Sequence, residues 1–502
     1  MVAHLKFSDL TEPAADVARS LSAYAHDFVV PTVRLGVTGL SRAGKTVFIT
    51  ALVRNLLADG RLPFFSAQAD GRIGRVYLEP QPDDDVPRFS YEDHLARLGA
   101  TDPQWPDGTN RISQLRLTIE YQRTSSLRRL LTPALGPGRL NIDIIDYPGE
   151  WLIDLVLLEQ DYDTWSREAL AAANTPHRQA AARPFLEFIA ALDRASPLDE
   201  AVALTGARLY TAYLEAQRAK EPALSTLGPG RFLMPGDLAG SPLLTFFPLP
   251  ESGSITRSTE GARASLGGQL GRRFESYKSY VVKPFFRNHF SRIDRQIVLI
   301  DALAALNAGP GAVSDLNEAI TSVLSAFRPG ANTIASRLFG RRVDRILFAA
   351  TKADHLHRSS HDRLELLLSA LTDRAMARAL FAGAEVKTLA MAAIRSTREA
   401  EAGNGDAALP CIIGTPIAGE RVADVIFDGR TETALFPGDL PDNPETLING
   451  TMAQQPVGAE DIRVLKFKPP RLALDLPDGR MLAPPHIRLD RAIEFLIGDK
   501  LA

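Results

Sequence analysis

The sequence has a single cysteine, no long hydrophobic run and no large excess of charge of either sign, and each absence excludes a class of protein. Cys411 alone can form neither an internal disulfide nor a thiolate metal cage, which argues against a secreted disulfide scaffold. The most apolar stretch, residues 297–306, contains Asp301 and is far shorter than the ~20 residues of a membrane-spanning helix. The formal net charge of -3 makes a nucleic-acid-binding surface a poor first hypothesis.

The start of the sequence does not have the pattern of a signal peptide. Charged residues are spread through residues 1–31, so an apolar segment of the kind that directs export is missing and we expect a cytoplasmic protein. Hydrophobic residues make up 45% of the chain and charged residues 23%, which is typical of globular proteins. At about 150 residues per domain, the length predicts roughly three folding units.

Composition and periodicity divide the chain into five parts. Residues 1–30 predict an N-terminal helix. Residues 31–151 and 291–400 carry alternating strand and helix patterns, and we expect them to form the two halves of one nucleotide-binding α/β domain. Residues 152–290 are rich in alanine and leucine at helical spacing, which predicts a helical insertion between the halves. Residues 401–502 predict an extension of mixed α and β structure.

Short apolar runs predict a mostly parallel sheet with helices on both faces. Residues 113–121 alternate apolar and polar side chains, which is typical of a half-buried edge strand. Residues 59–110 have recurring proline and glycine, and we expect them to be irregular. The other predicted strands are residues 32–38, 140–146, 296–300, 345–350 and 386–390, followed by short strands at 410–413, 424–427 and 463–467.

Residues 39–46 match the pattern G-x-x-x-x-G-K-[ST] between a predicted strand and a predicted helix. The glycines let backbone amides face phosphate groups, and the start of the helix adds partial positive charge. We expect Lys45 to contact the β- and γ-phosphates and the Thr46 hydroxyl to bind Mg²⁺. The residues predicted to surround the phosphates are Ser41, Arg42, Ala43, Gly44, Lys45, Thr46 and Val47.

A second motif, D-x-x-G, runs from Asp146 to Gly149 at the end of a predicted buried strand. An acidic residue there can hold a Mg²⁺-bound water, and the Gly149 amide can contact the γ-phosphate. The pattern alone is weak, and an aspartate that opens a Pro-Gly turn is the structural alternative. Its position near the phosphate-binding loop favours the metal-site interpretation.

A third motif, [NT]-K-x-D, is formed by Thr351, Lys352 and Asp354 after another apolar strand. The Asp354 carboxylate can accept hydrogen bonds from N1 and N2 of guanine, a donor pair that adenine lacks. The alkyl stem of Lys352 can lie along the plane of the base. The motif therefore predicts selectivity for a guanine nucleotide.

The three motifs, in this order, resemble those of the Ras-like GTPases. Residues 36–50, 146–151 and 351–354 are similar to the YcjX family of bacterial stress-associated GTPases. The resemblance implies the fold of a P-loop NTPase, binding of GTP and GDP with Mg²⁺, and a role in a bacterial stress response. It also implies an effector or an inner-membrane protein as partner, so that the protein is cytoplasmic or reaches the membrane through that partner.

The resemblance implies further site residues. The switch I threonine, which binds the metal, should be Thr109, with Ser113 as the alternative. The final base-contacting loop should be Ala392, Ala393 and Ile394, although the serine of the usual pattern is absent there.

Catalysis is where the sequence departs from the Ras pattern. Glu150 stands where Ras-like enzymes commonly have a water-orienting glutamine, and a second negative group near the γ-phosphate predicts slow turnover. Arg42 is the candidate for neutralising charge in cis, with a solvent-facing role as the alternative. The predicted catalytic residues are Lys45, Thr109, Gly149, Glu150 and Arg42.

Two other functions stay open at this point. The first is an ATP-dependent enzyme that uses Asp301, at the end of the predicted strand 296–300, as its acidic group. The second is a nucleotide-dependent scaffold that binds GTP and scarcely hydrolyses it. In the leading hypothesis the protein is a GTPase switch whose nucleotide state moves the helical insertion that follows Gly149.

Overall fold

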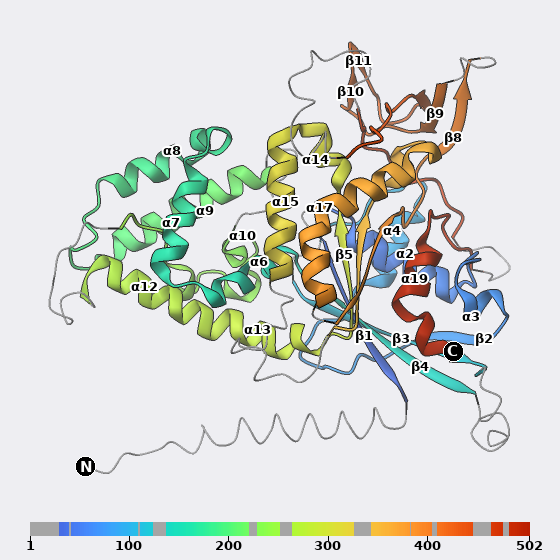
Figure 1. The fold of residues 1–502 in the computed structure, drawn as a ribbon, viewed down its shortest axis with the longest axis horizontal. Helices are drawn as coiled ribbons and strands as arrows, with labels where there is room; N and C mark the ends of the chain where they lie inside the picture. The colour runs from blue at the N-terminus through green and yellow to red at the C-terminus, as the bar shows by residue number, and fades with distance from the viewer. Residues whose placement is uncertain are drawn as a thin grey trace.

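The computed structural model describes residues 30–39, 42–108, 111–123, 137–219, 228–251, 264–325, 343–381, 383–403, 409–444, 463–474 and 481–502. The predicted N-terminal helix lies outside these residues. A central sheet has a group of helices on one side and a small β-rich extension at one edge (Figure 1). Among the described residues there is no helix whose length and hydropathy would let it cross a membrane.

The sheet has seven strands in the order β2-β3-β4-β1-β5-β6-β7. The five strands from β4 to β7 in this order are parallel, and β2 and β3 are antiparallel to their neighbours. This α/β architecture is consistent with a P-loop NTPase. The strands are β1 (Thr32–Gly39), β2 (Ile73–Glu79), β3 (Ser113–Tyr121), β4 (Gly138–Asp146), β5 (Arg295–Ile300), β6 (Arg345–Ala350) and β7 (Glu385–Ala390).

Successive side chains of the central strands point to two separate hydrophobic cores. In β5, Ile297 and Leu299 join one core, whereas Val298 and Ile300 join the other. The first core is covered by α2 (Lys45–Leu57), α4 (Tyr91–Leu98) and α19 (Leu489–Ile497). The second is covered by α14 (Ala302–Ala308), α15 (Pro310–Ser325) and α17 (His361–Phe381). Burial on both faces explains why the last four residues of β5, 297–300, are all apolar.

Between β4 and β5 the described chain is helical. Its aromatic core includes Trp165 and Phe274, whose rings stack with centroids 5.1 Å apart. This core is continuous with the second core of the sheet, so the helices and the sheet share one buried cluster. The main helices are α6 (Glu150–Val156), α7 (Tyr162–Ala173), α8 (Pro176–Ala190), α9 (Glu200–Ala219), α10 (Gly230–Leu233), α12 (Leu266–Tyr277) and α13 (Lys283–Asn288).

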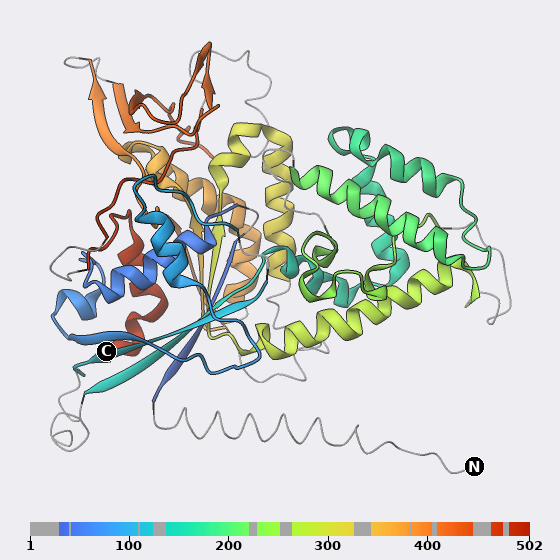
Figure 2. The same cartoon turned by 180° about the vertical axis from the view of Figure 1, so that it is seen from behind.

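After β7 the chain forms an extension and then returns to the sheet. An antiparallel sheet contains β8 (Arg398–Ala402), β9 (Leu409–Gly414) and β12 (Thr433–Leu435). A hairpin of β10 (Arg421–Val422) and β11 (Val425–Ile426) projects beside it. In both views α19, the last long helix, lies against the central sheet and far from this extension (Figures 1 and 2).

Three local predictions are wrong. Residues 59–110 contain β2 and α4, besides the short helix α3 (Ser66–Ala69). Because β2 pairs with β3, residues 113–121 form an interior strand and not the edge of the sheet. The polar face of β3 is covered because Arg116 forms a bidentate ion pair with buried Asp143 at 2.6 and 2.8 Å. The strand predicted at 463–467 is reduced to an isolated bridge between Phe467 and Pro416.

Candidate functional site

The predicted phosphate-binding loop joins the end of β1 to the start of α2. Gly44 precedes the helix with φ +83°, a left-handed conformation that favours glycine. At Gly39 a Cβ atom would lie 3.0 Å from Cγ of Lys45 and 3.1 Å from Cβ of Leu299, so the backbone approaches the lysine stem closely. Arg42 is exposed and also has positive φ, +60°. Ser41 lies outside the described residues.

The first turn of α2 contacts the loop that precedes the predicted switch I threonine. The Thr46 hydroxyl donates a hydrogen bond to the carbonyl oxygen of Asp107 at 3.2 Å. Lys45 and Val47 flank this buried threonine and are themselves partly exposed. Thr109 lies outside the described residues, two positions beyond Asp107. Ser113, the alternative, is the first residue of β3 and pairs with Asp146.

The D-x-x-G motif lies beside the loop because β4 and β1 are parallel neighbours. Asp146 is paired in register with Val37, two residues before the end of β1, and only 1% of Asp146 is exposed. The following Tyr147 donates its hydroxyl to Oε1 of Gln296 on β5 at 2.7 Å, which anchors this turn to the sheet. Gly149 then caps α6. The carboxyl ends of β1 and β4 therefore meet at one edge.

The donor set at this edge suits a hard divalent cation. Thr46 supplies a hydroxyl oxygen and Asp146 a carboxylate oxygen, and Mg²⁺ prefers oxygen ligands completed by water and phosphate. Thr46 and Asp146 are 6% and 1% exposed, so both polar groups are held in place by surrounding structure. The residues present thus fit Mg²⁺.

Glu150 is turned towards the helical region. Its carboxylate lies 3.4 Å from the guanidinium of Arg218 on α9. Asp154, one turn further along α6, accepts the Gly230 amide at 2.7 Å and the Tyr277 hydroxyl at 2.6 Å. Burial raises the pKa of Asp154 to about 6, although both hydrogen bonds favour the ionised form. The segment after Gly149 is therefore fastened to α9, α10 and α12.

The third motif follows β6, which is two strands from β1. The Thr351 amide donates to the carbonyl of Ile300 at 2.9 Å, and Lys352 has φ +60°. The Lys352 ammonium pairs with Asp301, whose other carboxylate oxygen accepts the Ala304 amide at 3.1 Å and caps α14. Asp301 thus stabilises the lysine of the motif and the adjoining helix.

Asp354 is 3% exposed, and its carboxylate is oriented by Ser396. The Ser396 amide and hydroxyl donate to Oδ2 of Asp354 at 2.7 and 2.5 Å. Oδ1 makes no hydrogen bond within the described chain. The Thr397 hydroxyl donates to the Asp354 carbonyl. Ser396 is a candidate site residue that the sequence analysis missed. The sequence gives one weak signal for it. Ser396 stands a few positions after the place where the base-contacting loop usually has its serine.

The predicted base-contacting loop follows β7 and is held by the C-terminal segment. Ala392 and Ile487 exchange backbone hydrogen bonds of 3.0 and 2.8 Å, so the Ala392 amide is already used. The Arg395 amide donates to the carbonyl of Pro485 at 2.7 Å. Ala393 and Ile394 lie between these two anchors. Ala393 is partly exposed, whereas Ile394 is buried and belongs to the first hydrophobic core, so the contact of this loop with a base stays a prediction.

The extension links the guanine motif to the loop before Thr109. The Trp105 indole donates to the carbonyl of Phe467 at 2.7 Å, and Lys468 pairs with Asp102 at 2.8 Å. The ring of Phe467 also packs edge-on against buried His355, with centroids 5.1 Å apart. Burial lowers the pKa of His355, so the ring is neutral at pH 7. One segment therefore contacts both halves of the candidate site.

The sequence was compared with protein-family models and with curated proteins. The model of the YcjX-like family, DUF463, matches residues 33–501. The chain belongs to the YcjX-like family. A relative from Escherichia coli (strain K12) called "Ras-like GTPase YcjX" is 38% identical over 474 residues, which cover 93% of this chain and 96% of the relative. A relative of the same name from Shewanella oneidensis (strain MR-1) is 32% identical over 492 residues, 93% of this chain and 94% of the relative. The resemblance noted from the motifs is confirmed over nearly the whole chain.

Proposed function

We propose that this member of the YcjX-like family binds GTP and GDP with Mg²⁺ and hydrolyses GTP slowly as a molecular switch. The observation that carries the proposal is the Asp354 carboxylate. It is buried at the carboxyl edge of the sheet, with one oxygen anchored by Ser396 and the other left for a ligand. A buried carboxylate oxygen that is left without a donor costs binding free energy. The site therefore binds a base that cannot donate to it more weakly. The name that the relatives carry, Ras-like GTPase, supports the same function.

In this proposal each motif has one task. Lys45 and the amides of the loop before α2 hold the phosphates, and Gly149 contacts the γ-phosphate. Thr46, Thr109 and Asp146 would hold Mg²⁺, which neutralises charge on the β- and γ-phosphate oxygens when it is bound. Thr351 and Lys352 shape the base pocket, and Ala393 and Ile394 close it.

Slow turnover follows from the position of Glu150. Its ion pair with Arg218, 3.4 Å away, holds the carboxylate towards α9. A carboxylate is also a poor substitute for glutamine next to the charged γ-phosphate. Arg42, exposed on the loop, is the cationic group that can supply charge in cis. We therefore expect turnover to increase when a partner repositions either group.

The helical region is the proposed output of the switch. Besides the Asp154 contacts, the Trp151 indole donates to the carbonyl of Met234 at 3.3 Å, and the Arg231 guanidinium lies 3.3 Å from the centre of the Trp151 ring. A change at Gly149 is thereby passed to α10 through a rigid contact. We further propose that this output acts in a bacterial stress response, in the cytoplasm or at the inner membrane through a protein partner.

Calorimetric titration tests the base selectivity. We expect tight binding of GDP with Mg²⁺, weak binding of ADP, and loss of GDP affinity in Asp354→Ala. Asp373→Ala, which removes an exposed aspartate of α17, is the matched control. Equal affinity for both nucleotides, unaffected by Asp354→Ala, would sink the proposal.

Turnover assays separate the proposal from its alternatives. An ATP-dependent enzyme that uses Asp301 requires a large loss of ATP turnover in Asp301→Asn with no preference for guanine. The cap and ion pair that Asp301 forms argue against that role. A scaffold without hydrolysis predicts that a single-turnover reaction releases no phosphate over hours. We expect slow but measurable release from GTP.

A further inference from the structure

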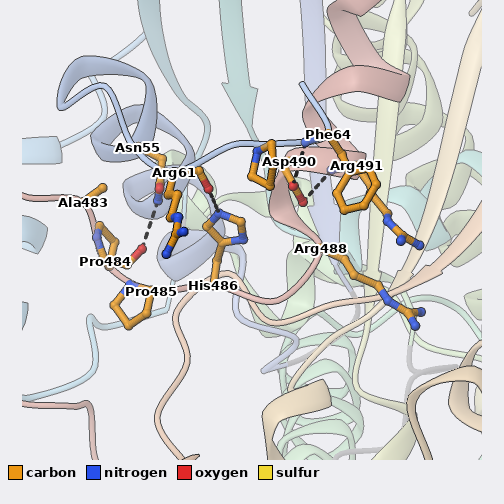
Figure 3. Close-up of a pocket in the computed structure, with 11 residues that line it drawn as sticks. Asn55, Arg61, Phe64, Ala483, Pro484, Pro485, His486, Arg488, Asp490 and Arg491 are labelled. Atoms are coloured by element: carbon orange, nitrogen blue, oxygen red, sulfur yellow. Dashed lines mark hydrogen bonds between the residues drawn. The ribbon is translucent and has the colours of Figure 1, made fainter. Parts of the chain in front are cut away.

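Residues 485–488, which precede α19, run along the predicted base-contacting loop, and we call them the strap. The Ala392 amide donates to the carbonyl of Ile487 at 3.0 Å, and the Ile487 amide donates to the carbonyl of Ala392 at 2.8 Å. The Pro485 carbonyl accepts the Arg395 amide at 2.7 Å. The strap also lines a cavity of about 510 Å³ (Figure 3). Three backbone hydrogen bonds thus make the position of the loop depend on the position of the strap.

The last residue of the strap, Arg488, has an unusual backbone conformation. Its φ is +55°, in the left-handed region that favours glycine. Such conformations persist where surrounding contacts over-determine them, and they concentrate at functional sites. Arg42 and Lys352, which belong to two of the candidate nucleotide-binding motifs, also have positive φ. Arg488 belongs to no motif, so the contacts that hold it need an explanation of their own.

The Arg488 side chain joins the strap to the start of α17. Its Nη1 donates to Oε2 of Glu365 at 2.8 Å, and its Nη2 donates to Oδ1 of Asp362 at 2.5 Å. The two carboxylates are three positions apart on α17 and therefore lie on one face of the helix. Figure 3 shows the Arg488 side chain extending away from Pro485 and His486. The strap is thereby fixed to a helix that packs against the sheet.

Glu365 also holds the start of the base-contacting loop. Its Oε2, the atom that accepts Arg488, accepts the Ala390 amide at 3.2 Å as well. Ala390 is the last residue of β7 and comes two positions before Ala392. Because two donors converge on one carboxylate oxygen, loss of Arg488 leaves Glu365 freer to turn away from Ala390. Arg488 therefore acts on the loop through the strap and through Glu365.

The stretch held in this way carries groups that the proposed guanine site uses. The amide of Ala393, a partly exposed residue, makes no hydrogen bond within the described chain. A backbone N–H group can pair with O6 of guanine, whereas adenine has an amino group at that position. Ser396, which orients the Asp354 carboxylate, directly follows Arg395. A shift of the loop would therefore disturb two contacts that distinguish guanine from adenine.

We propose that Arg488 is a positioning residue for guanine recognition. Its two ion pairs hold the strap, and the strap holds the base-contacting loop in the arrangement that binds the base. Arg488 acts through Pro485, Ile487 and Glu365 and does not itself touch the nucleotide. This inference rests on the proposed function. Loss of the ion pairs should weaken binding of guanine and leave the phosphate contacts intact, because the phosphate-binding loop is held by β1 and α2.

The test compares the affinities of GDP and ADP, each with Mg²⁺, for the full-length wild type and for Arg488→Gln. Glutamine keeps a side chain at φ +55°, so the backbone strain is matched and the charge is lost. We expect GDP to bind about 3- to 10-fold more weakly and ADP to bind within about twofold of wild type. Arg488→Lys keeps the charge and should recover part of the GDP affinity. Hydrogen exchange of residues 390–396 in the nucleotide-free protein should be faster in Arg488→Gln.

The matched control is Arg345→Gln. Arg345 also pairs with two carboxylates, those of Glu385 at 2.9 Å and Asp499 at 3.2 Å, and its side chain is 21% exposed against 19% for Arg488. It lies at the start of β6, at the opposite edge of the sheet from the candidate site. We expect its GDP affinity to stay within about twofold of wild type. Thermal unfolding of each variant shows whether it is folded.

The outcomes separate the positioning role from the proposed function. Equal binding of GDP and ADP to wild type would refute the proposed function, and the positioning role with it. If wild type prefers GDP, an unchanged preference in Arg488→Gln would refute the positioning role alone. Parallel losses of GDP and ADP affinity, or an equal GDP loss in Arg345→Gln, would show a general structural effect and would also refute it. If Arg488→Gln does not fold, GDP affinity in Arg488→Lys equal to that of wild type refutes the role, and a loss confined to GDP supports it.

Discussion

Replacement of Ser396 by alanine should weaken GDP binding about 10- to 30-fold. The change removes the hydroxyl bond of 2.5 Å to Oδ2 of Asp354 and leaves the amide bond of 2.7 Å. A hydrogen bond to a charged group contributes about 1.5–3 kcal/mol. Because one of the two anchors remains, we expect the lower part of that range, about 1.5–2 kcal/mol, which gives the stated loss of affinity.

The assay is calorimetric titration of GDP and ADP with Mg²⁺. Weak ADP binding should not change, since adenine gains nothing from an oriented Asp354. Ser360→Ala is the matched control because Ser360 is also buried and donates to a different carboxylate, that of Asp439, at 3.3 Å. GDP affinity within about twofold of wild type in Ser396→Ala, or an equal loss in Ser360→Ala, would refute the positioning role.

Three further predictions concern the loop, the helical contact and the extension. Gly44→Ala forces a side chain into φ +83° and should cost about 1 kcal/mol of stability, measured by thermal unfolding, while lowering GDP affinity. Burial raises the folded-state pKa of Asp154 from 3.8 to about 6, so its stabilising contribution belongs to the protonated form and is lost as the pH rises through 6. The unfolding free energy of wild type relative to Asp154→Asn should accordingly fall by about 1–2 kcal/mol between pH 5 and pH 7.5, and a rise would contradict the burial argument. Trp105→Phe removes the donor to the Phe467 carbonyl and should speed hydrogen exchange of residues 99–108 about fivefold, a loss of about 1 kcal/mol. Unchanged exchange there would show that the indole bond does not hold the loop.

Strands of the central sheet were predictable where an apolar sequence pattern matches a strand that is buried in the structure. The runs at 140–146, 296–300 and 345–350 are rich in apolar residues because β4, β5 and β6 are buried on both faces. The pattern fails for β2, which has a glycine, an arginine and exposed positions and depends on its pairing with β3. It fails again at 463–467, where a β-like sequence makes only an isolated bridge.

The positions of candidate site residues were predictable where a short motif follows a strand. Lys45, Asp146 and Asp354 lie at the same edge of the sheet because β1, β4 and β6 are parallel. Ser396 could not be assigned in the same way. Its contact with Asp354 depends on the path of the chain after β7, which is held by Ile487, almost a hundred residues later. Long-range packing of this kind leaves no local pattern.

The most direct test of the proposed guanine site is the nucleotide preference of Asp354→Asn. The Ser396 amide and hydroxyl both donate, so they should hold the new amide oxygen at the position of Oδ2 and turn its nitrogen towards the base. A donor there repels guanine and suits xanthine, which has a carbonyl where guanine has its amino group. We predict that the variant binds xanthosine diphosphate more tightly than GDP, the reverse of wild type. Unchanged preference for GDP at wild-type affinity would contradict recognition of the base by Asp354.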